Sequence, residues 1–169
     1  QAFVSTGRFD YQDCKMNTPS EILTFGWREW VGLPDIGIRQ IKAKVDTGAR
    51  TSALHAFELR PYTEDGRDRV EFRIHPVQKD PDTVIICNAD VIDTRTVTDS
   101  GGHKEDRYVI ETTLRIGKHT WPIEITLTSR DDMMFRMLLG RTAIKHRAQV
   151  NPARSYLVGK KKKFKKQPE

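Results

Sequence analysis

The sequence has few cysteines and no long apolar run. Its 169 residues include only two cysteines, Cys14 and Cys87, which fit neither a disulfide framework nor a zinc site. No stretch approaches the roughly 18 consecutive apolar residues of a membrane-spanning helix. These absences predict reduced thiols, no membrane partner and a cytoplasmic protein, and the sequence leaves open a processed leader before Gln1.

Patterns for metal and nucleotide chemistry are also missing. There is no His-Glu-x-x-His helix, and the five histidines have no metal-ligand spacing: His55, His75, His103, His119 and His146. Gly32 and Gly37 have the spacing of a phosphate-binding loop, but Ile38 and Arg39 follow where that loop requires lysine and then serine or threonine. We therefore expect no metal, no ATP and no other cofactor.

Acidic residues are fewer than basic ones, 23 against 29, which gives a formal net charge of +6. The excess corresponds to the lysines at the C-terminal end: Lys160, Lys161, Lys162, Lys163, Lys165 and Lys166. Without them the chain is electrically neutral. We expect residues 159–169 to form a disordered, solvated basic tail. The alternative is a tail that associates with RNA or with ribosomes through phosphate contacts.

What the sequence does contain is short stretches of alternating apolar and polar residues between glycines and prolines. We predict a hairpin over 28–46, strands at 70–75, 83–87, 91–97, 108–116, 121–127, 133–139 and 155–158, turns or loops at 61–69 and 78–82, and one short helix at 142–146. Residues 51–59 fit a strand or a loop equally well. This pattern predicts an all-β sandwich or barrel, preceded by an arm over residues 1–24.

The stretch 41–55 is the most informative part of the chain. Apolar residues alternate with lysines up to Val45, as in a half-buried strand, and Asp46-Thr47-Gly48 follows directly. A carboxylate at the end of an apolar strand face loses solvation, so local donors must compensate it. A threonine hydroxyl and a glycine, which lets backbone approach closely, suit that role.

Asp46-Thr47-Gly48-Ala49 resembles the active-site motif of the retropepsin-like aspartic peptidases. A second mark of that family, an apolar strand that enters Gly-Arg and then a short helix, is similar to residues 137–144, with Gly140 and Arg141 at its centre. Between the two motifs lies a hairpin tip with Gly101 and Gly102, where the family has its flap.

Four further stretches, 26–34, 42–55, 121–124 and 135–141, resemble one bacterial subfamily whose members are labelled ATP-dependent zinc proteases. It includes a peptidase that trims glutamate tails added to a ribosomal protein by an ATP-grasp ligase. The residues give the zinc and ATP label no support. The resemblance covers residues 25–158. It instead implies a metal- and ATP-independent endopeptidase with a closed barrel of the acid-protease type and one short C-terminal helix.

The resemblance also implies roles for individual residues. Two Asp46 carboxylates, one from each subunit of a homodimer, would share one proton and activate a water. Thr47 would brace the two loops and Gly48 would let them approach. Ala49 would hydrogen-bond substrate through its backbone. Gly101, Gly102 and His103 would contact substrate from the flap, and Gly140 with Arg141 would support the site.

Arg50 departs from the pattern of the viral members, which have an acidic residue there to pair with the arginine of Gly-Arg. Arg141 is therefore expected to find an acid elsewhere in the chain. Arg50, Lys42, Lys44 and His55 together predict an acidic peptide as substrate, such as a glutamate tail. Arg50 also favours ionised carboxylates, so the alternative is a non-catalytic module that binds acidic peptides. His55 also fits a purely structural role.

Overall fold

The computed structural model describes residues 21–129 and 134–164, and strands dominate this part of the chain. Residues 1–20 of the expected arm and Met133 lie outside the described residues. The elements in chain order are β1 (Leu23–Gly26), β2 (Arg28–Leu33), the 3-10 turn η1 (Pro34–Ile36), β3 (Ile38–Val45), β4 (Ser52–His55), β5 (Phe57–Glu64), β6 (Arg67–Ile74), β7 (Ile85–Thr98), β8 (Lys104–Ile116), β9 (His119–Thr128), β10 (Met137–Leu139), α1 (Arg141–Ile144) and β11 (Ala148–Asn151).

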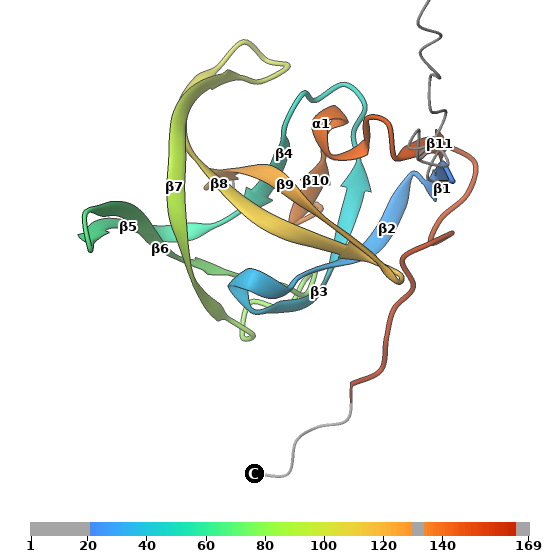
Figure 1. The fold of residues 1–169 in the computed structure, drawn as a ribbon, viewed down its shortest axis with the longest axis horizontal. Coiled ribbons are helices and arrows are strands. Elements are labelled where there is room, and N and C mark those ends of the chain that lie inside the picture. The colour runs from blue at the N-terminus through green and yellow to red at the C-terminus, as the bar shows by residue number, and fades with distance from the viewer. Residues whose placement is uncertain (1–20, 130–133, 165–169) are drawn as a thin grey trace, which may run out of the picture.

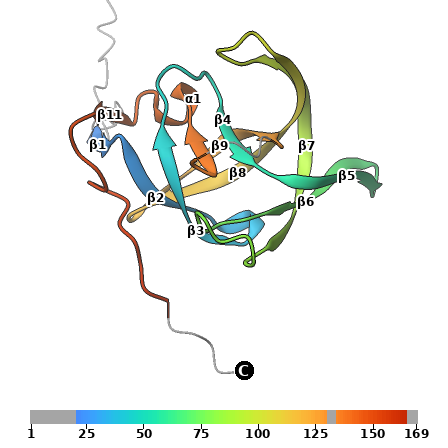
Figure 2. The ribbon, with the colours of Figure 1, turned by 180° about the vertical axis from the view of Figure 1, so that it is seen from behind.

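Two sheets make up the described fold (Figure 1). One has nine strands in the order β2-β3-β10-β4-β9-β8-β7-β6-β5, and the other pairs β1 with β11. β2 also contacts β8 through the pair Gly32 and Arg115, which bends the large sheet back on itself. Seen from behind, the β5–β6 hairpin protrudes on the side away from β1 and β11 (Figure 2).

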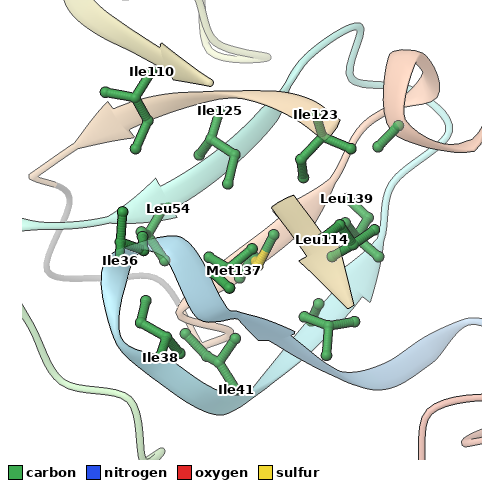
Figure 3. Close-up of a cluster of buried hydrophobic side chains, with 14 of the residues drawn as sticks. Ile36, Ile38, Ile41, Leu54, Ile110, Leu114, Ile123, Ile125, Met137 and Leu139 are labelled. Carbon is green, nitrogen blue, oxygen red and sulfur yellow. The ribbon is translucent and has the colours of Figure 1, made fainter. Parts of the chain in front are cut away.

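The core fills the inside of this curved sheet (Figure 3). Alternating residues of β3 point into it, and Ile41 and Ala43 are fully buried. Leu54, Ile125 and Met137, from three other strands, are also fully buried and belong to the same apolar cluster. The strand that leads to Asp46 is therefore fixed by packing along its whole inner face.

The mostly-β class with one short C-terminal helix is confirmed. Two local predictions are wrong. Residues 61–64 continue β5, and only Asp65 and Gly66 form the turn before β6. β5 is the last strand of its sheet, where the missing N–H of Pro61 costs no ladder bond. The predicted strand 155–158 is irregular, because the N–H groups of Leu157 and Val158 donate to the Glu29 carboxylate instead.

β11 was not predicted from the sequence, because its partner, β1, is more than a hundred residues away in the chain. β1 begins at Leu23, so the first strand in the described residues starts inside the predicted arm. The basic tail also differs from expectation in its first residues. Gly159 is buried, and the Lys162 N–H donates to the Gln40 side chain. No helix in the described residues is long and apolar enough to cross a membrane.

Candidate active site

The end of β3 places Asp46 beside β10. The two strands run parallel with Leu139 opposite Val45, and the Asp46 N–H donates to the Leu139 carbonyl at 2.8 Å. The carboxylate then folds back on its own loop. Its Oδ1 accepts the N–H groups of Gly48 at 3.0 Å and Ala49 at 3.2 Å. Oδ2 accepts no hydrogen bond from the described residues, so one carboxylate oxygen is available for chemistry.

Arg141, at the start of α1, holds the other side of this loop. Its Nη1 donates to the carbonyls of Thr47 at 2.9 Å and Gly48 at 3.1 Å, and its backbone N–H donates to the Ala49 carbonyl. The expectation that Arg141 needs an acid is therefore wrong for the described residues. The loop turns its carbonyl oxygens towards α1, and their partial negative charges take the place of a carboxylate.

Gly140 allows this contact because no side chain would fit there. A Cβ at Gly140 would lie 2.5 Å from the Thr51 carbonyl carbon and 2.8 Å from the Ser52 nitrogen. The Gly140 N–H also donates to the Ser52 Oγ at 3.1 Å. The glycine of the Gly-Arg pair therefore sets how closely α1 approaches the chain that follows Asp46.

Gly140→Ala is expected to lower the free energy of unfolding by about 1–3 kcal/mol, because the added methyl overpacks backbone that cannot move freely. Urea unfolding followed by tryptophan fluorescence measures the change. Gly101→Ala is the matched control, since its methyl would meet only the side chains of His103 and Asp99 at the exposed hairpin tip. Equal stability of the two variants would contradict the close approach at Gly140.

The predicted flap is the hairpin of β7 and β8, whose tip lies at the same end of the molecule as the loop between β3 and β4 (Figure 1). Asp99 organises the tip. Its Oδ1 accepts the N–H groups of Gly101 at 2.8 Å and His103 at 3.0 Å, and its own N–H donates to the His103 carbonyl. Gly102 has φ of +84°, a conformation that favours glycine. The tip is thus a defined turn.

A groove of about 620 Å³ lies between the Asp46 loop and the flap. Of the predicted site residues, Asp46, Gly48, Ala49 and Arg50 line it. Thr47 borders a second hollow, described below. The flap contributes residues 95–100, whereas Gly101, Gly102 and His103 lie beyond the groove at the exposed tip.

His55 was predicted to bind substrate, and the structure contradicts this. His55 is only 2% exposed, and it does not line the groove. It lies in β4, where its N–H donates to the Arg136 carbonyl at 2.8 Å. Burial leaves His55 with the structural role that the sequence also allowed.

Two arginines of the groove were not predicted from the sequence as site residues. Arg95 of β7 and Arg107 of β8 are directly opposite each other in the hairpin, and both line the groove. Like charges in that position repel unless acids neutralise them. The signal was present in the alternation of the flap strands, since each arginine occupies an inward-facing position and is more buried than both of its neighbours in the strand.

Acidic side chains do neutralise both arginines. Arg95 donates to Glu124 at 2.8 Å and to Asp93 at 2.7 Å, and these two hydrogen bonds raise the pKa of Arg95. In return Arg95, with the Thr94 N–H, lowers the pKa of Asp93. Arg107 donates through Nε to Glu105 at 2.7 Å, and Glu105 also accepts from Thr128.

A second hollow of about 810 Å³ borders the same loop at α1 and β11. Thr47, Arg50 and Arg141 line it, together with apolar side chains that include Ile144 and Val150. Within the described ranges, no three histidine, cysteine, aspartate or glutamate side chains form a group that could hold a metal ion.

Comparison with known proteins agrees with this geometry. A family model described as RimB-like, "Retropepsin-like aspartic endopeptidase RimB", matches residues 24–161. A probable alpha-L-glutamate ligase from Shewanella halifaxensis is 43% identical over 134 residues, 79% of this chain and 29% of that protein. One from Parasynechococcus marenigrum is 46% identical over 134 residues, again 79% of this chain and 29% of that protein. The chain thus spans under a third of these relatives.

Among solved structures, a protein of unknown function (DUF785) from Legionella pneumophila has the same fold. Its TM-score is 0.68 at 23% identity, and the match covers 80% of this chain and 97% of that one. The family match extends over most of the chain and includes both the Asp46 loop and the Gly140 turn. The chain therefore belongs to the RimB-like family of retropepsin-like aspartic endopeptidases.

Proposed function

We propose that this protein is an aspartic endopeptidase that hydrolyses peptide bonds in acidic peptides, glutamate tails among them. The observation that carries the proposal is the Asp46 carboxylate at the groove wall. Two loop amides hold its Oδ1, and Oδ2 accepts no hydrogen bond from the described residues. A carboxylate held in this way has one oxygen left to take a proton from water or to donate one to a scissile carbonyl.

The reaction needs a second carboxylate close to the first, so that one is ionised while the other stays protonated. The chain has a single Asp-Thr-Gly motif. We therefore infer that a second copy supplies the other Asp46 in a twofold homodimer. The ionised Asp46 takes a proton from water, the water oxygen attacks the carbonyl carbon, and the protonated Asp46 donates to the carbonyl oxygen. Collapse of the tetrahedral species transfers a proton to the amine that leaves.

The surface beside the Asp46 loop supports such a dimer. Thr47 is exposed and borders the 810 Å³ hollow, whose lining includes apolar residues of α1 and β11. Among the described strands, β1 and β11 pair only with each other, so each has an unpaired edge. Unpaired edges readily accept a strand from another chain. A second copy that meets this face would bring its own Thr47 and Asp46 towards the first.

Arginines support an acidic substrate. Arg50 lines the groove next to the Asp46 loop and is exposed. The flap adds Arg95 and Arg107 opposite it, whose acidic partners occupy only part of each guanidinium and leave further N–H groups for a substrate carboxylate. Guanidinium groups bind carboxylates through paired, charge-assisted hydrogen bonds. The relatives carry the name alpha-L-glutamate ligase, which agrees with a substrate that contains glutamate. The same arginines would serve a non-catalytic module that binds acidic peptides, which is the alternative.

Arg95→Gln is expected to raise KM for a glutamate-tailed peptide about tenfold and to leave kcat nearly unchanged, because it removes one charged hydrogen-bond donor from the groove. Steady-state cleavage measured over a range of peptide concentrations gives both constants. Arg60→Gln removes an arginine that is paired with Glu71 on the outer β5–β6 hairpin, away from the groove, and should change neither. A purely structural Arg95 would lower kcat and stability without a selective effect on KM.

The direct test is digestion of a poly-glutamate-tailed peptide, read by mass spectrometry with and without EDTA. We expect cleavage that resists the chelator and whose specific rate falls on dilution, as the dimer dissociates. Size-exclusion chromatography with light scattering gives the mass over the same concentrations. Binding without cleavage would favour the recruiting module. Cleavage that EDTA abolishes, or whose specific rate is constant while the protein is a monomer, would contradict the proposal.

A further inference from the structure

Seven cationic side chains gather where the C-terminal segment crosses β2 and β3. We call this the basic surface, and it consists of Arg39, Lys42, Arg115, Lys160, Lys161, Lys162 and Lys163. Five of them border a hollow of about 150 Å³ together with Trp30 and Gln40. In Figure 1 the segment descends from β11 past β2. The lysines are thus part of a composite surface that includes residues of three strands, β2, β3 and β8.

The charge of the basic surface is not neutralised by the domain. None of its seven cations forms a salt bridge with any residue that the structure describes. Elsewhere arginines are paired, for example Arg69 with Glu64 and Asp90, and Arg73 with Glu58. Because exposed like charges repel one another, an unneutralised group of this size favours an anionic partner.

The lysines are also held in place. The buried Glu29 carboxylate accepts the backbone N–H groups of Leu157, Val158 and Gly159. The Gly159 carbonyl accepts the Trp30 N–H, and a Cβ at Gly159 would lie 1.9 Å from the Trp30 carbonyl oxygen. The backbone is therefore fixed immediately before the first lysine. A surface ordered in advance loses less conformational entropy when it binds.

Aromatic rings lie between the cations. The ammonium groups of Lys42 and Lys161 lie 5.3 Å and 5.6 Å from the Trp30 ring centre. Arg39 lies 5.7 Å from the ring centre of Phe164, which is 43% exposed. Positively charged grooves with interleaved aromatic side chains are typical of proteins that bind single-stranded nucleic acid, since cations contact phosphates and rings stack on bases.

We propose that the basic surface binds a single-stranded polynucleotide. The cations contact the phosphodiester backbone, and the exposed Phe164 ring stacks on a base. An acidic peptide would satisfy the cations and would offer the exposed Phe164 ring no base to stack on. Stable anchoring to a membrane takes an apolar signal in addition to the cations. The other exposed large apolar residues lie outside this surface: Ile22, Val77, Val84, Ile86, Ile92 and Met134. The inference does not depend on the peptidase activity.

The test is fluorescence anisotropy of a labelled single-stranded RNA, with DNA of the same sequence in parallel, at several salt concentrations. Lys160→Ala with Lys161→Ala is expected to weaken binding about tenfold and to reduce the slope of log K against log salt by about 1.4, since each lost phosphate contact contributes about 0.7. The control, Lys79→Ala with Lys104→Ala, removes the same charge from exposed sites elsewhere. It should change binding much less.

Phe164→Ala separates base contacts from charge. It is expected to weaken RNA binding about fivefold with an unchanged salt slope, because no cation is removed. Three results would overturn the proposal: equal losses in the two lysine pairs, competition by poly-L-glutamate as strong as that by unlabelled RNA, or binding to phosphatidylserine vesicles without binding to RNA. Peptide cleavage should be the same in the Lys160/Lys161 and Phe164 variants as in the wild-type protein.

Discussion

Asp46→Asn is expected to fold like the wild-type protein and to lose cleavage of a glutamate-tailed peptide by a factor of at least about 10²–10⁴, the typical contribution of general acid–base catalysis. An asparagine keeps an Oδ1 that accepts the Gly48 and Ala49 N–H groups, so the loop geometry is retained. It cannot take a proton from water. In a homodimer the substitution removes both carboxylates at once, which leaves no acid–base pair.

The measurement is single-turnover cleavage followed by mass spectrometry, with circular dichroism and thermal unfolding to verify the fold. Asp82→Asn is the matched control, an exposed aspartate in the loop between β6 and β7. Its activity should equal that of the wild-type protein. Cleavage that survives Asp46→Asn would show that the active site is elsewhere. If both the wild-type protein and the variant bind the peptide and neither cleaves it, the domain is a recruiting module.

Asp46 could be identified from sequence because the features that mark it are local. The alternation up to Val45 predicts the strand, and the N–H groups of Gly48 and Ala49, directly after Asp46, are the donors for the carboxylate. The Gly140 turn could also be identified from sequence, because its apolar strand and its glycine are adjacent in the chain. The flap tip could be predicted as well, because Gly101 and Gly102 mark a turn between two stretches of alternating apolar and polar residues.

The partners of these residues depend on the tertiary fold and were not predictable. The sequence suggested an acid for Arg141, whereas the folded loop offers the Thr47 and Gly48 carbonyls. Residue type likewise suggested that His55 faces substrate, although β4 lies between β10 and β9 and buries it. Arg95 and Arg107 could have been found, because strand alternation alone gives their inward direction. What alternation does not give is that this part of the hairpin faces Asp46.

Glu29 is a residue whose importance only the fold reveals. Glu29→Ala is expected to lower the free energy of unfolding by at least about 3 kcal/mol. The carboxylate is fully buried, and it accepts backbone N–H groups from Gly26 and from residues 157–159. Each buried donor left without an acceptor costs about 1–3 kcal/mol. Urea unfolding measures the loss. Glu58→Ala, which removes an exposed glutamate paired with Arg73, should cost less than about 1 kcal/mol.

The same variant should release the C-terminal segment before the domain unfolds. Glu29 joins β2 to the backbone directly before Lys160, so its loss removes the contact that holds this segment against the sheet. Limited trypsin digestion at Lys160–Lys163 should therefore become faster at urea concentrations where the rest of the domain stays folded. Glu29→Gln should fall between the wild-type protein and Glu29→Ala, because an amide keeps one acceptor oxygen and turns a donor towards the remaining N–H groups. Unchanged unfolding and digestion in Glu29→Ala would mean that apolar packing alone holds the segment in place.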